Sequence, residues 1–499
     1  MSKQFVLGLD IGTTSTKAVL FQLNGTVVSE HEVFYSISHP KPGFAEQNPD
    51  EIENACRQSI KAILQKSGTT YLDWIGCGLS TAMHSLICLN HEFEPITHSI
   101  IWADQRSVAQ ASYLKETRPD LYHRTGTPIH PMSPLTKISW IKENDPLLFE
   151  KSAYFVSIKE YILHKWFGTK MTDYATASST GFFNIHSFTW DEEALQVLGI
   201  GEEQLFTPVD AMTILEGMKQ EIADDIGLTT DFPFVIGATD GPLANLGIGA
   251  VSENALAITI GTSGAIRRFS NQPAPDKDQR TFSYAVTKEL WINGGPTNNG
   301  GIVLEWLRTL FDNPHSTLSH KQFISLAEDV KPGANGLLFL PLLSGERAPY
   351  WDANAKGTFV GLTRAHQKEH FVRAGLEGVI FSIFSVAESF TDVTDSNLTL
   401  YASGGFARSP FWLQMVSDIF DKPVTVPVSH QSSAWGAAWV ALYSLDYVSS
   451  LEDITAFIPL GDKILPNKPN HAIYKELYPV YRSLYENLKE TFSKLNQFS

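Results

Sequence analysis

The stretch that decides the fold is Gly8-Leu9-Asp10-Ile11-Gly12-Thr13-Thr14-Ser15-Thr16-Lys17. A near-copy, Ile258-Thr259-Ile260-Gly261-Thr262-Ser263-Gly264, lies far downstream. Each copy has an apolar run, then Gly-Thr and another hydroxyl residue, then a second apolar run, which predicts a strand, a tight turn and a returning strand. Glycine lets backbone N–H groups approach a phosphate closely, and the hydroxyls add donors. Two such turns facing each other predict a protein of two similar lobes that holds ATP between them, which is typical of a phosphotransferase or an ATPase.

Length and charge set broad limits. A chain of 499 residues is too long for one hydrophobic core, so two domains are expected. Hydrophobic residues make up 43% and charged residues 18%, which is ordinary for a globular protein. The formal net charge of -16 argues against nucleic acid and against an anionic membrane as partners. An anionic small substrate remains compatible, because a local pocket can be basic in an acidic protein.

The cysteines and the start of the chain carry no further signal. Cys56, Cys77 and Cys88 show no CxxC spacing, so neither a disulfide framework nor a zinc site is expected. The chain opens directly into a strand-like segment, without the apolar region and cleavage site of a signal peptide, and no stretch reads as a membrane span. The cytoplasm is the expected compartment.

The first half reads as strands followed by helices. Strands are predicted at residues 5–9, 16–23 and 26–33, and Asn24-Gly25 suits the hairpin between the last two. A helix should begin near Asn48-Pro49-Asp50-Glu51, and a further apolar strand covers residues 75–79. This order predicts an α/β domain built in layers.

The second half repeats this opening. Ala255–Ile260, Gly264–Phe269 and Leu290–Asn293 are predicted strands, and Gly301–Phe311 is the predicted helix after them. The repetition indicates a duplicated fold. A Gly-rich stretch near Gly247–Ser252 places the boundary between a first domain, residues 1–247, and a second domain, residues 248–499, which ends in an amphipathic helix.

Two longer motifs carry a family resemblance. Met132 to Asn144, MSPLTKISWIKEN, fits the first signature of the FGGY carbohydrate kinases at every specified position. Gly357 to Glu377 nearly fits the second signature, with Gly375 where the pattern prefers another small residue. The chain therefore resembles this family over nearly its whole length. Within the family it is most similar to the gluconate kinases, on three segments: residues 80–85, 102–107 and 126–132.

The resemblance implies two ribonuclease H-like α/β domains of the actin-like ATPase superfamily, with a central cleft. It implies ATP and Mg²⁺ as cofactors, a sugar acid as substrate, and a homodimer as an option through the second-domain face.

Asp240, after the predicted strand 234–236, matches the family's catalytic base, and it would also contact the sugar and the metal. Asp10 matches the Mg²⁺ partner, acting through water. From the local sequence alone, a turn aspartate that stabilises its own backbone is the more common role for Asp240, and the family match reverses that preference. Asp10 could cap the turn as a strand-end residue, a role compatible with metal binding.

The nucleotide residues are also implied by the resemblance. The order of residues after the first glycine is not that of a Walker A loop. A lone Gly-Thr turn or Gly-Gly pair would more often be an ordinary hairpin or turn. The assignment of ATP-binding residues therefore depends mainly on the family match. The residues that match ATP-binding positions are Gly12, Thr13, Thr14, Ser15, Lys17, Gly261, Thr262, Gly300, Gly301, Gly404, Gly405 and Ser409.

The sugar is expected on the first domain. Met83, His84 and Met132 match family substrate positions, and Asp104 and Arg106 lie in a segment that resembles the sugar-side loop. His84 has the alternative role of a hydrogen-bonded loop histidine, and Asp104 with Arg106 that of a surface pair. Hydroxyl-rich ligands need paired donors and acceptors. A gluconate carboxylate has four candidate partners, among which the sequence does not choose: Arg106, His84, His130 and Lys137.

The expected reaction is transfer of the ATP γ-phosphoryl group to a primary hydroxyl of D-gluconate, giving 6-phospho-D-gluconate. A xylulokinase or another FGGY kinase is the near alternative, since its pocket would bind a neutral ketose. A non-kinase actin-like ATPase and a degenerate sugar-binding regulator are the alternatives from other classes. The two family signatures and Asp240 argue against the ATPase, and the intact Asp10, Asp240 and phosphate turns argue against the regulator.

Overall fold

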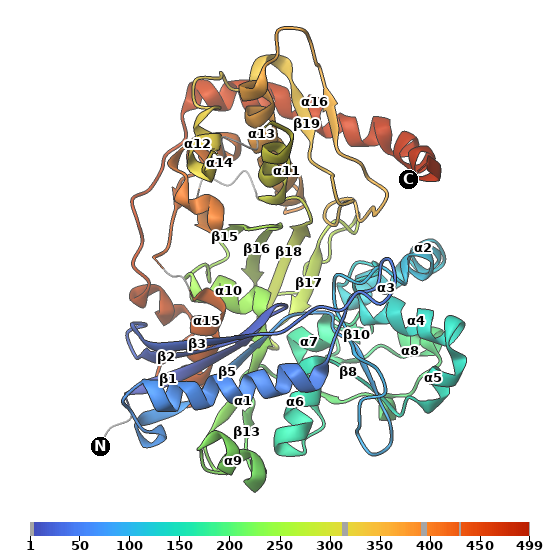
Figure 1. Cartoon of the computed structure of the whole chain (residues 1–499), viewed down its shortest axis with the longest axis vertical. Helices are drawn as coiled ribbons and strands as arrows, with labels where there is room; N and C mark the ends of the chain where they lie inside the picture. The colour runs from blue at the N-terminus through green and yellow to red at the C-terminus, as the bar shows by residue number, and fades with distance from the viewer. Residues whose placement is uncertain (1–3, 312–317, 391–396, 429–430, 499) are drawn as a thin grey trace.

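The computed structural model describes residues 4–311, 318–390, 397–428 and 431–498. Two six-stranded sheets dominate it, one in the lower half of Figure 1 and one in the upper half. The first has the order β13-β14-β5-β1-β2-β3 and the second β17-β18-β16-β15-β21-β22. The strands of the first sheet are β1 (Phe5–Ile11), β2 (Ser15–Gln22), β3 (Val27–Phe34), β5 (Trp74–Thr81), β13 (Ile214–Leu215) and β14 (Phe234–Thr239).

The two sheets share one topology. β1 pairs antiparallel with β2 and parallel with β5, and β5 pairs parallel with β14. In the second sheet, β15 pairs antiparallel with β16 and parallel with β21, and β21 pairs parallel with β22. This repetition confirms the predicted duplicated α/β fold. The strands of the second sheet are β15 (Ala255–Ile260), β16 (Gly264–Ser270), β17 (Phe282–Ala285), β18 (Trp291–Thr297), β21 (Thr399–Ser403) and β22 (Val424–Thr425).

Most predicted elements of these sheets are present, with shifted ends. The predicted hairpin at Asn24-Gly25 joins β2 to β3, and β5 extends past the predicted Leu79 to Thr81. The short edge strand β17 lies between the predicted second and third strands of the repeat and was missed. The terminal helix α16 (Lys468–Leu495) begins six residues before the predicted Tyr474.

Strand alternation sends the side chains of β1 to two different cores. Leu7 and Leu9 pack beneath α1 (Pro49–Lys66), whereas Val6 belongs to the core on the opposite face. That opposite face is covered by α15 (Ser432–Ser444), which comes from the second half of the chain. A Cβ atom on Gly8 would lie 2.0 Å from the carbonyl oxygen of Ala434, so this close packing requires glycine in β1.

Each half therefore contributes to the packing of the other. α10 (Asp240–Gly247), from the first half, packs against α15 and β16, and both helices lie between the two sheets in Figure 1. The expected division into residues 1–247 and 248–499 stays a prediction about independent units. The position of α15 shows that the sheets do not divide the chain at a single point.

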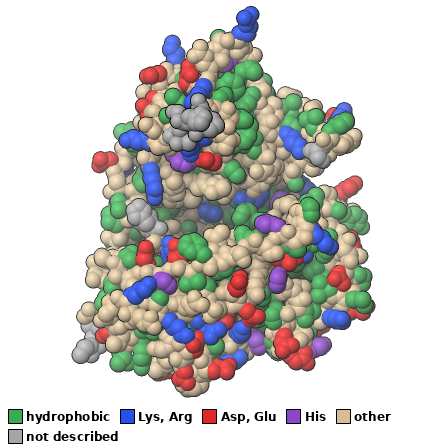
Figure 2. Space-filling model, in the orientation of Figure 1, with side chains coloured by type: hydrophobic (Ala, Val, Ile, Leu, Met, Phe, Trp, Pro, Cys, Tyr) green, Lys and Arg blue, Asp and Glu red, His purple; other side chains and the backbone are tan. Residues whose placement is uncertain are grey.

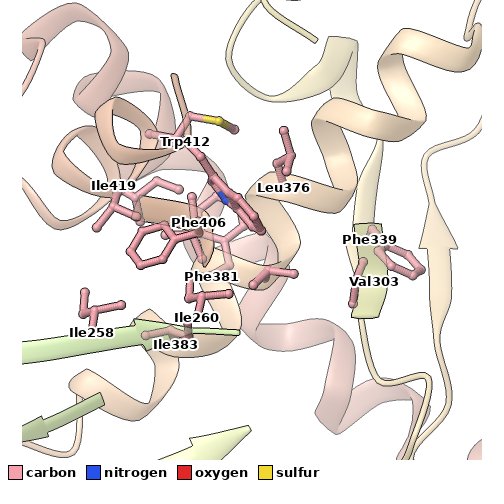
Figure 3. Close-up of a cluster of buried hydrophobic side chains, with 14 of the residues drawn as sticks. Ile258, Ile260, Val303, Phe339, Leu376, Phe381, Ile383, Phe406, Trp412 and Ile419 are labelled. Atoms are coloured by element: carbon pink, nitrogen blue, oxygen red, sulfur yellow. The ribbon is translucent and has the colours of Figure 1, made fainter. Parts of the chain in front are cut away.

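The second core is formed around β15. Ile258 and Ile260 belong to one buried cluster with side chains of α11 (Ile302–Phe311), α13 (Lys368–Ala387) and α14 (Pro410–Phe420), part of which Figure 3 shows. α13 is long and apolar enough to cross a membrane, but 83% of its apolar window is buried within the protein. It is the central helix of this core.

The remaining elements connect these cores and surround the cleft. The helices are α2 (Val108–Thr117), α3 (Asp120–Thr125), α4 (Pro134–Asn144), α5 (Pro146–Lys151), α6 (Ile158–Phe167), α7 (Tyr174–Ser178), α8 (Glu192–Leu198), α9 (Gln220–Ile226) and α12 (His320–Ser325). The strands are β4 (Glu46–Gln47), β6 (Ile87–Leu89), β7 (Ser99–Ile100), β8 (Tyr154–Val156), β9 (Met171–Asp173), β10 (Phe183–Asn184), β11 (Thr189–Trp190), β12 (Thr207–Val209), β19 (Leu338–Leu340) and β20 (Thr358–Val360).

Candidate active site

The first Gly-Thr turn connects β1 to β2. It is closed by a 2.9 Å hydrogen bond from the Gly12 amide to the Ser15 carbonyl. Three side chains fix it from outside: the Tyr35 hydroxyl donates to the Gly12 carbonyl at 2.6 Å, Gln47 donates to the Thr13 carbonyl at 2.7 Å, and the Trp102 indole donates to Thr13 Oγ1 at 3.0 Å. Thr14 is exposed. The turn is therefore held rigidly, with Thr14 at its accessible tip.

Two other residues predicted for phosphate binding share an acidic partner. Ser15 Oγ donates to Glu32 Oε1 at 2.6 Å, and Lys17 Nζ lies 3.3 Å from Glu32 Oε2. The Lys17 side chain remains 27% exposed, so it could exchange Glu32 for a phosphate. Glu32 was not anticipated from the sequence.

Asp10 ends β1 directly before the turn. Ser80 Oγ, from the neighbouring β5, donates to Asp10 Oδ1 at 2.7 Å. Burial raises the pKa of Asp10 to about 6, the hydrogen bond from Ser80 lowers it, and the charge of Asp240 raises it. The two carboxylates predicted to serve the metal and the base are therefore close enough to repel each other.

Asp240 is the first residue of α10, immediately after β14. Burial raises the pKa of its carboxyl group, while the charge of Arg267 and the backbone amide of Gly241 lower it. Arg267 lies in β16 of the other sheet, and a Cβ atom on Gly241 would be 3.2 Å from its Nε. The candidate base is thus half-buried, at a helix start, beside an arginine from the opposite lobe.

The predicted nucleotide residues of the second half converge on the second turn. The Gly301 amide donates to the Gly261 carbonyl at 2.6 Å, and the Gly300 amide to the Thr262 carbonyl at 3.2 Å. A Cβ atom on Gly404 would meet the carbonyl oxygen of Ile260 at 2.5 Å, which places it at the end of β15. The turn, the start of α11 and the end of β21 therefore form one surface.

Some of this surface is open. Gly261, Thr262, Gly404 and Gly405 are exposed, and a Cβ atom on Gly261 or Gly405 would meet nothing within 4 Å. Bare backbone with free space above it is what a nucleotide needs for close approach. Ser409 is different, because its hydroxyl accepts the Trp412 amide at 3.2 Å and caps α14.

The predicted sugar residues include a pair of neutral imidazoles. His84 Nδ1 donates to the Ser179 carbonyl at 2.7 Å, whereas His130 Nδ1 accepts the Met132 amide at 3.2 Å. Burial lowers the pKa of each histidine to about 3. His84 therefore keeps Nε2 as an acceptor and His130 keeps Nε2–H as a donor, a complementary pair for hydroxyl groups. Met83 approaches Gly241, with its methyl group 2.6 Å from a Cβ atom placed there.

Asp104 and Arg106 form a buried ion pair, and the alternative of a surface pair is wrong. The Asp104 carboxylate accepts the Ala45 amide at 2.7 Å and Arg106 Nε at 2.9 Å. Arg106 also donates to Glu46 and lies over the Phe44 ring, 4.0 Å from its centroid. The side chains are 0% and 6% exposed. Both residues are engaged in holding residues 43–47, and their contact with a substrate stays a prediction.

Lys137 is buried completely, and Nζ donates to the carbonyls of His84 at 2.6 Å, Ile101 at 2.9 Å and Ile100 at 3.1 Å. These bonds use all three donors of an ammonium group. Burial lowers its pKa to about 7. Lys137 therefore positions the His84 segment.

Two arginines were missed by the sequence reasoning. Figure 2 shows a hollow between the two halves of the molecule, with Lys and Arg side chains visible inside it. Arg267 and Arg347 are half-buried, and neither Nε has a hydrogen-bond partner among the residues described. Arg267 had one signal: it is one of two adjacent arginines inside the strand that follows the second turn. Arg347 lies in a segment without periodicity and had none.

The donor set fits a magnesium ion that keeps most of its water. Asp10 and Asp240 supply two neighbouring carboxylates, and no cluster of three acidic, histidine or cysteine ligands occurs within the described ranges. Mg²⁺ is commonly held by one or two carboxylates together with substrate phosphates. The open glycine surface of the second lobe fits a nucleotide in the same way.

Comparison with known proteins agrees with this geometry. The model of the FGGY family of carbohydrate kinases, N-terminal domain, matches residues 5–247, and that of the C-terminal domain matches residues 256–445. A gluconokinase from Bacillus licheniformis is 41% identical over 99% of this chain and 98% of its own length. Solved structures of a gluconate kinase and of a ligand-bound xylulose kinase, both from Lactobacillus acidophilus, superpose with a TM-score of 0.94 each, at 36% and 35% identity. They cover 99% of this chain and 99% and 100% of their own. The chain belongs to the FGGY family of carbohydrate kinases, enzymes that transfer a phosphoryl group to an alcohol.

Proposed function

We propose that this enzyme transfers the γ-phosphoryl group of ATP to the primary hydroxyl of D-gluconate, giving 6-phospho-D-gluconate. The observation that carries the proposal is the position of Asp240, whose charge acts on Asp10 before the first turn and which lies beside Arg267 of the opposite sheet. The relatives named gluconokinase and gluconate kinase support the choice of substrate.

Asp240 acts as the general base in this proposal. Burial raises its pKa, which makes the carboxylate a better proton acceptor, and the positive charge of Arg267 opposes this rise. Phosphoryl transfer needs mainly positioning and charge neutralisation, so one oriented carboxylate is sufficient. The His84 ring nitrogen would accept from a sugar hydroxyl, the His130 ring N–H would donate to an oxygen of the sugar acid, and Met83 and Met132 would pack beside the carbon chain.

Asp10 and Asp240 would hold Mg²⁺, largely through water. The ion, when bound, supplies positive charge that neutralises the polyphosphate. The first turn, Gly12–Ser15, and Lys17 would contact the phosphates from one lobe. The second turn and the glycines beside it would contact the nucleotide from the other lobe; they are Gly261, Thr262, Gly300, Gly301, Gly404 and Gly405. Ser409 would support this surface by capping α14.

A xylulose kinase is the second candidate, because a protein of that name superposes as well as the gluconate kinase does. Product identification separates the two. The enzyme is incubated with Mg-ATP and either gluconate or xylulose, and the phosphate ester is located by phosphorus–proton NMR. An ester at C6 of gluconate supports the proposal. An ester on xylulose alone would replace it. Assembly as a homodimer stays a separate prediction, which sedimentation equilibrium tests.

A further inference from the structure

Arg347 occupies a distinctive position in the cleft. It lies in the segment between β19 and β20, and its Nη2 donates to the Thr297 carbonyl at 3.2 Å. The guanidinium faces the Trp102 ring, with 5.1 Å from Cζ to the ring centroid. Thr297 belongs to the second sheet, whereas Trp102 contacts the first phosphate turn. Arg347 therefore reaches across the cleft from one lobe to the other.

Among the residues that the structure describes, this guanidinium forms no ion pair with a carboxylate, although the charges of Glu346 and Asp240 act on it. Its sequence neighbour Glu346 is completely buried and accepts bonds from neutral donors: Thr297 Oγ1 at 2.7 Å, the Asn298 amide at 2.9 Å and Asn299 Nδ2 at 3.1 Å. The Arg347 guanidinium donates to a neutral carbonyl, that of Thr297, and its Nε has no hydrogen-bond partner among the described residues. A cation held inside a protein is normally paired, so this one has the character of an anion-binding group.

The two missed arginines differ in what surrounds them. Arg267 is the strongest charge acting on Asp240, and its Nε lies 3.2 Å from a Cβ atom placed on Gly241. Arg347 acts more weakly on Asp240, and its charge helps to lower the pKa of both His84 and His130. Arg267 therefore acts mainly on the candidate base Asp240, whereas Arg347 also acts on the two histidines.

A sugar acid has its carboxylate at one end of the carbon chain and its primary hydroxyl at the other. The carboxylate partner must therefore lie away from Asp240, on the side where the hydroxyl-binding histidines are. The cations considered from the sequence are already engaged: Lys137 by three carbonyls, and Arg106 by Asp104 and Glu46. His84 and His130 are neutral hydrogen-bonding groups and supply no charge.

We propose that Arg347 binds the carboxylate of the sugar-acid substrate, with the Nε2–H group of His130 as a second donor. The planar guanidinium suits bidentate recognition of a carboxylate, and its face is supported by Trp102. This assignment rests on the proposed function. Arg347 is then the residue that makes an acid preferable to a neutral sugar.

The test is steady-state kinetics of the full-length enzyme with Arg347→Gln and Arg347→Lys. Arg347→Gln should raise KM for gluconate by roughly 10- to 100-fold, as expected for the loss of a charge-assisted hydrogen bond, and leave KM for Mg-ATP within about threefold. Arg347→Lys should keep part of the affinity. Arg364→Gln, at an exposed arginine, is the matched control and should match the wild type.

A neutral ligand gives a readout that a merely structural role would not produce. D-Glucitol carries a hydroxymethyl group in place of the carboxylate, and its competitive inhibition constant should be the same in wild type and Arg347→Gln. An unchanged KM for gluconate in Arg347→Gln would overturn the assignment. An equal loss of affinity for gluconate and Mg-ATP would overturn it too. Lys115 lines a pocket together with His130, so a gluconate effect found in Lys115→Gln and absent from Arg347→Gln would also overturn it. Failure of the wild type to phosphorylate gluconate would instead refute the proposed function.

Discussion

Lys137 Nζ donates a 2.6 Å hydrogen bond to the main-chain carbonyl of His84, whose backbone is left-handed with φ 65°. The left-handed conformation is unfavourable for a residue other than glycine, so a buried lysine stabilises it from α4. The lysine belongs to the segment Met132–Asn144 that carries the first family signature. Part of that signature therefore serves to position His84, a residue predicted to contact the sugar.

Lys137→Met should destabilise the protein and weaken sugar binding together. Three buried carbonyls lose their donor, at about 1–3 kcal/mol for each unsatisfied group. We expect a loss of several kcal/mol in the free energy of unfolding, measured by urea denaturation, and a higher KM for gluconate. Lys142→Met is the control, because Lys142 lies on the same helix and donates to one carbonyl, that of Leu198. Equal losses in the two variants would contradict the role given to Lys137.

Asp240→Asn should abolish most of the turnover while ATP still binds. Removal of a general base costs about 100- to 10,000-fold in kcat. Calorimetric titration with ATP checks that the nucleotide site is intact. Asp446→Asn, at an exposed aspartate, controls for the loss of an acidic residue. Near-normal turnover in Asp240→Asn would remove Asp240 as the base.

Ser80→Ala should raise the magnesium requirement. The hydrogen bond from Ser80 lowers the pKa of Asp10, so its loss leaves the carboxylate less acidic and a poorer cation partner. We expect the Mg²⁺ concentration for half-maximal activity to rise several-fold, with kcat at saturating Mg²⁺ largely retained. An unchanged magnesium dependence would speak against Asp10 as the metal partner.

Alanine substitutions at Gly300 and Gly405 should distinguish a glycine needed for packing from one needed only for nucleotide contact. Gly300→Ala places a Cβ atom 2.4 Å from the Ser263 carbonyl oxygen, so it should lower Tm and raise KM for ATP. Gly405→Ala meets nothing within 4 Å and should leave Tm unchanged. If ATP lies against Gly405, this second variant still raises KM for ATP. An unaltered KM for ATP in Gly405→Ala would contradict the prediction that the nucleotide lies against Gly405.

Acid should destabilise the folded enzyme through its buried histidines. An unfolded histidine binds a proton near pH 6.5, whereas His84 and His130 do so near pH 3. Between these values the unfolded state binds more protons, so the free energy of unfolding falls as the pH is lowered, by about 1.4 kcal/mol per pH unit for each histidine. The double variant His84→Asn, His130→Asn should lose less stability between about pH 7 and pH 5.5 than the wild type does. His91→Asn, at an exposed position, should retain the wild-type slope.

The local parts of this fold could be predicted from the sequence. The alternation in Phe5–Ile11 and the glycine and hydroxyl residues after it specify a strand and a turn through neighbouring residues alone. The same is true of β15, which is why the duplication was visible. Asp10 and Asp240 were found because they directly follow apolar strands.

The remaining features depend on contacts between distant segments. α15 packs on β1 and β5, but its sequence does not predict this contact. Its apolar residues are spread around the whole helix, so they predict burial without identifying the neighbouring strands. The burial of Asp104 with Arg106 depends on Glu46 and Phe44, which belong to another segment. Arg347 lies in an irregular stretch, and only the folded chain places it opposite Trp102.

The most direct test of the central claim is sugar-dependent ADP release from Mg-ATP. Gluconate, xylulose, ribulose and glycerol are compared with a control that contains no sugar. The account predicts rapid ADP release with gluconate and only a slow background in the control. Turnover with a ketose and none with gluconate would contradict the assigned substrate, and equal ADP release in every reaction would contradict a sugar kinase altogether.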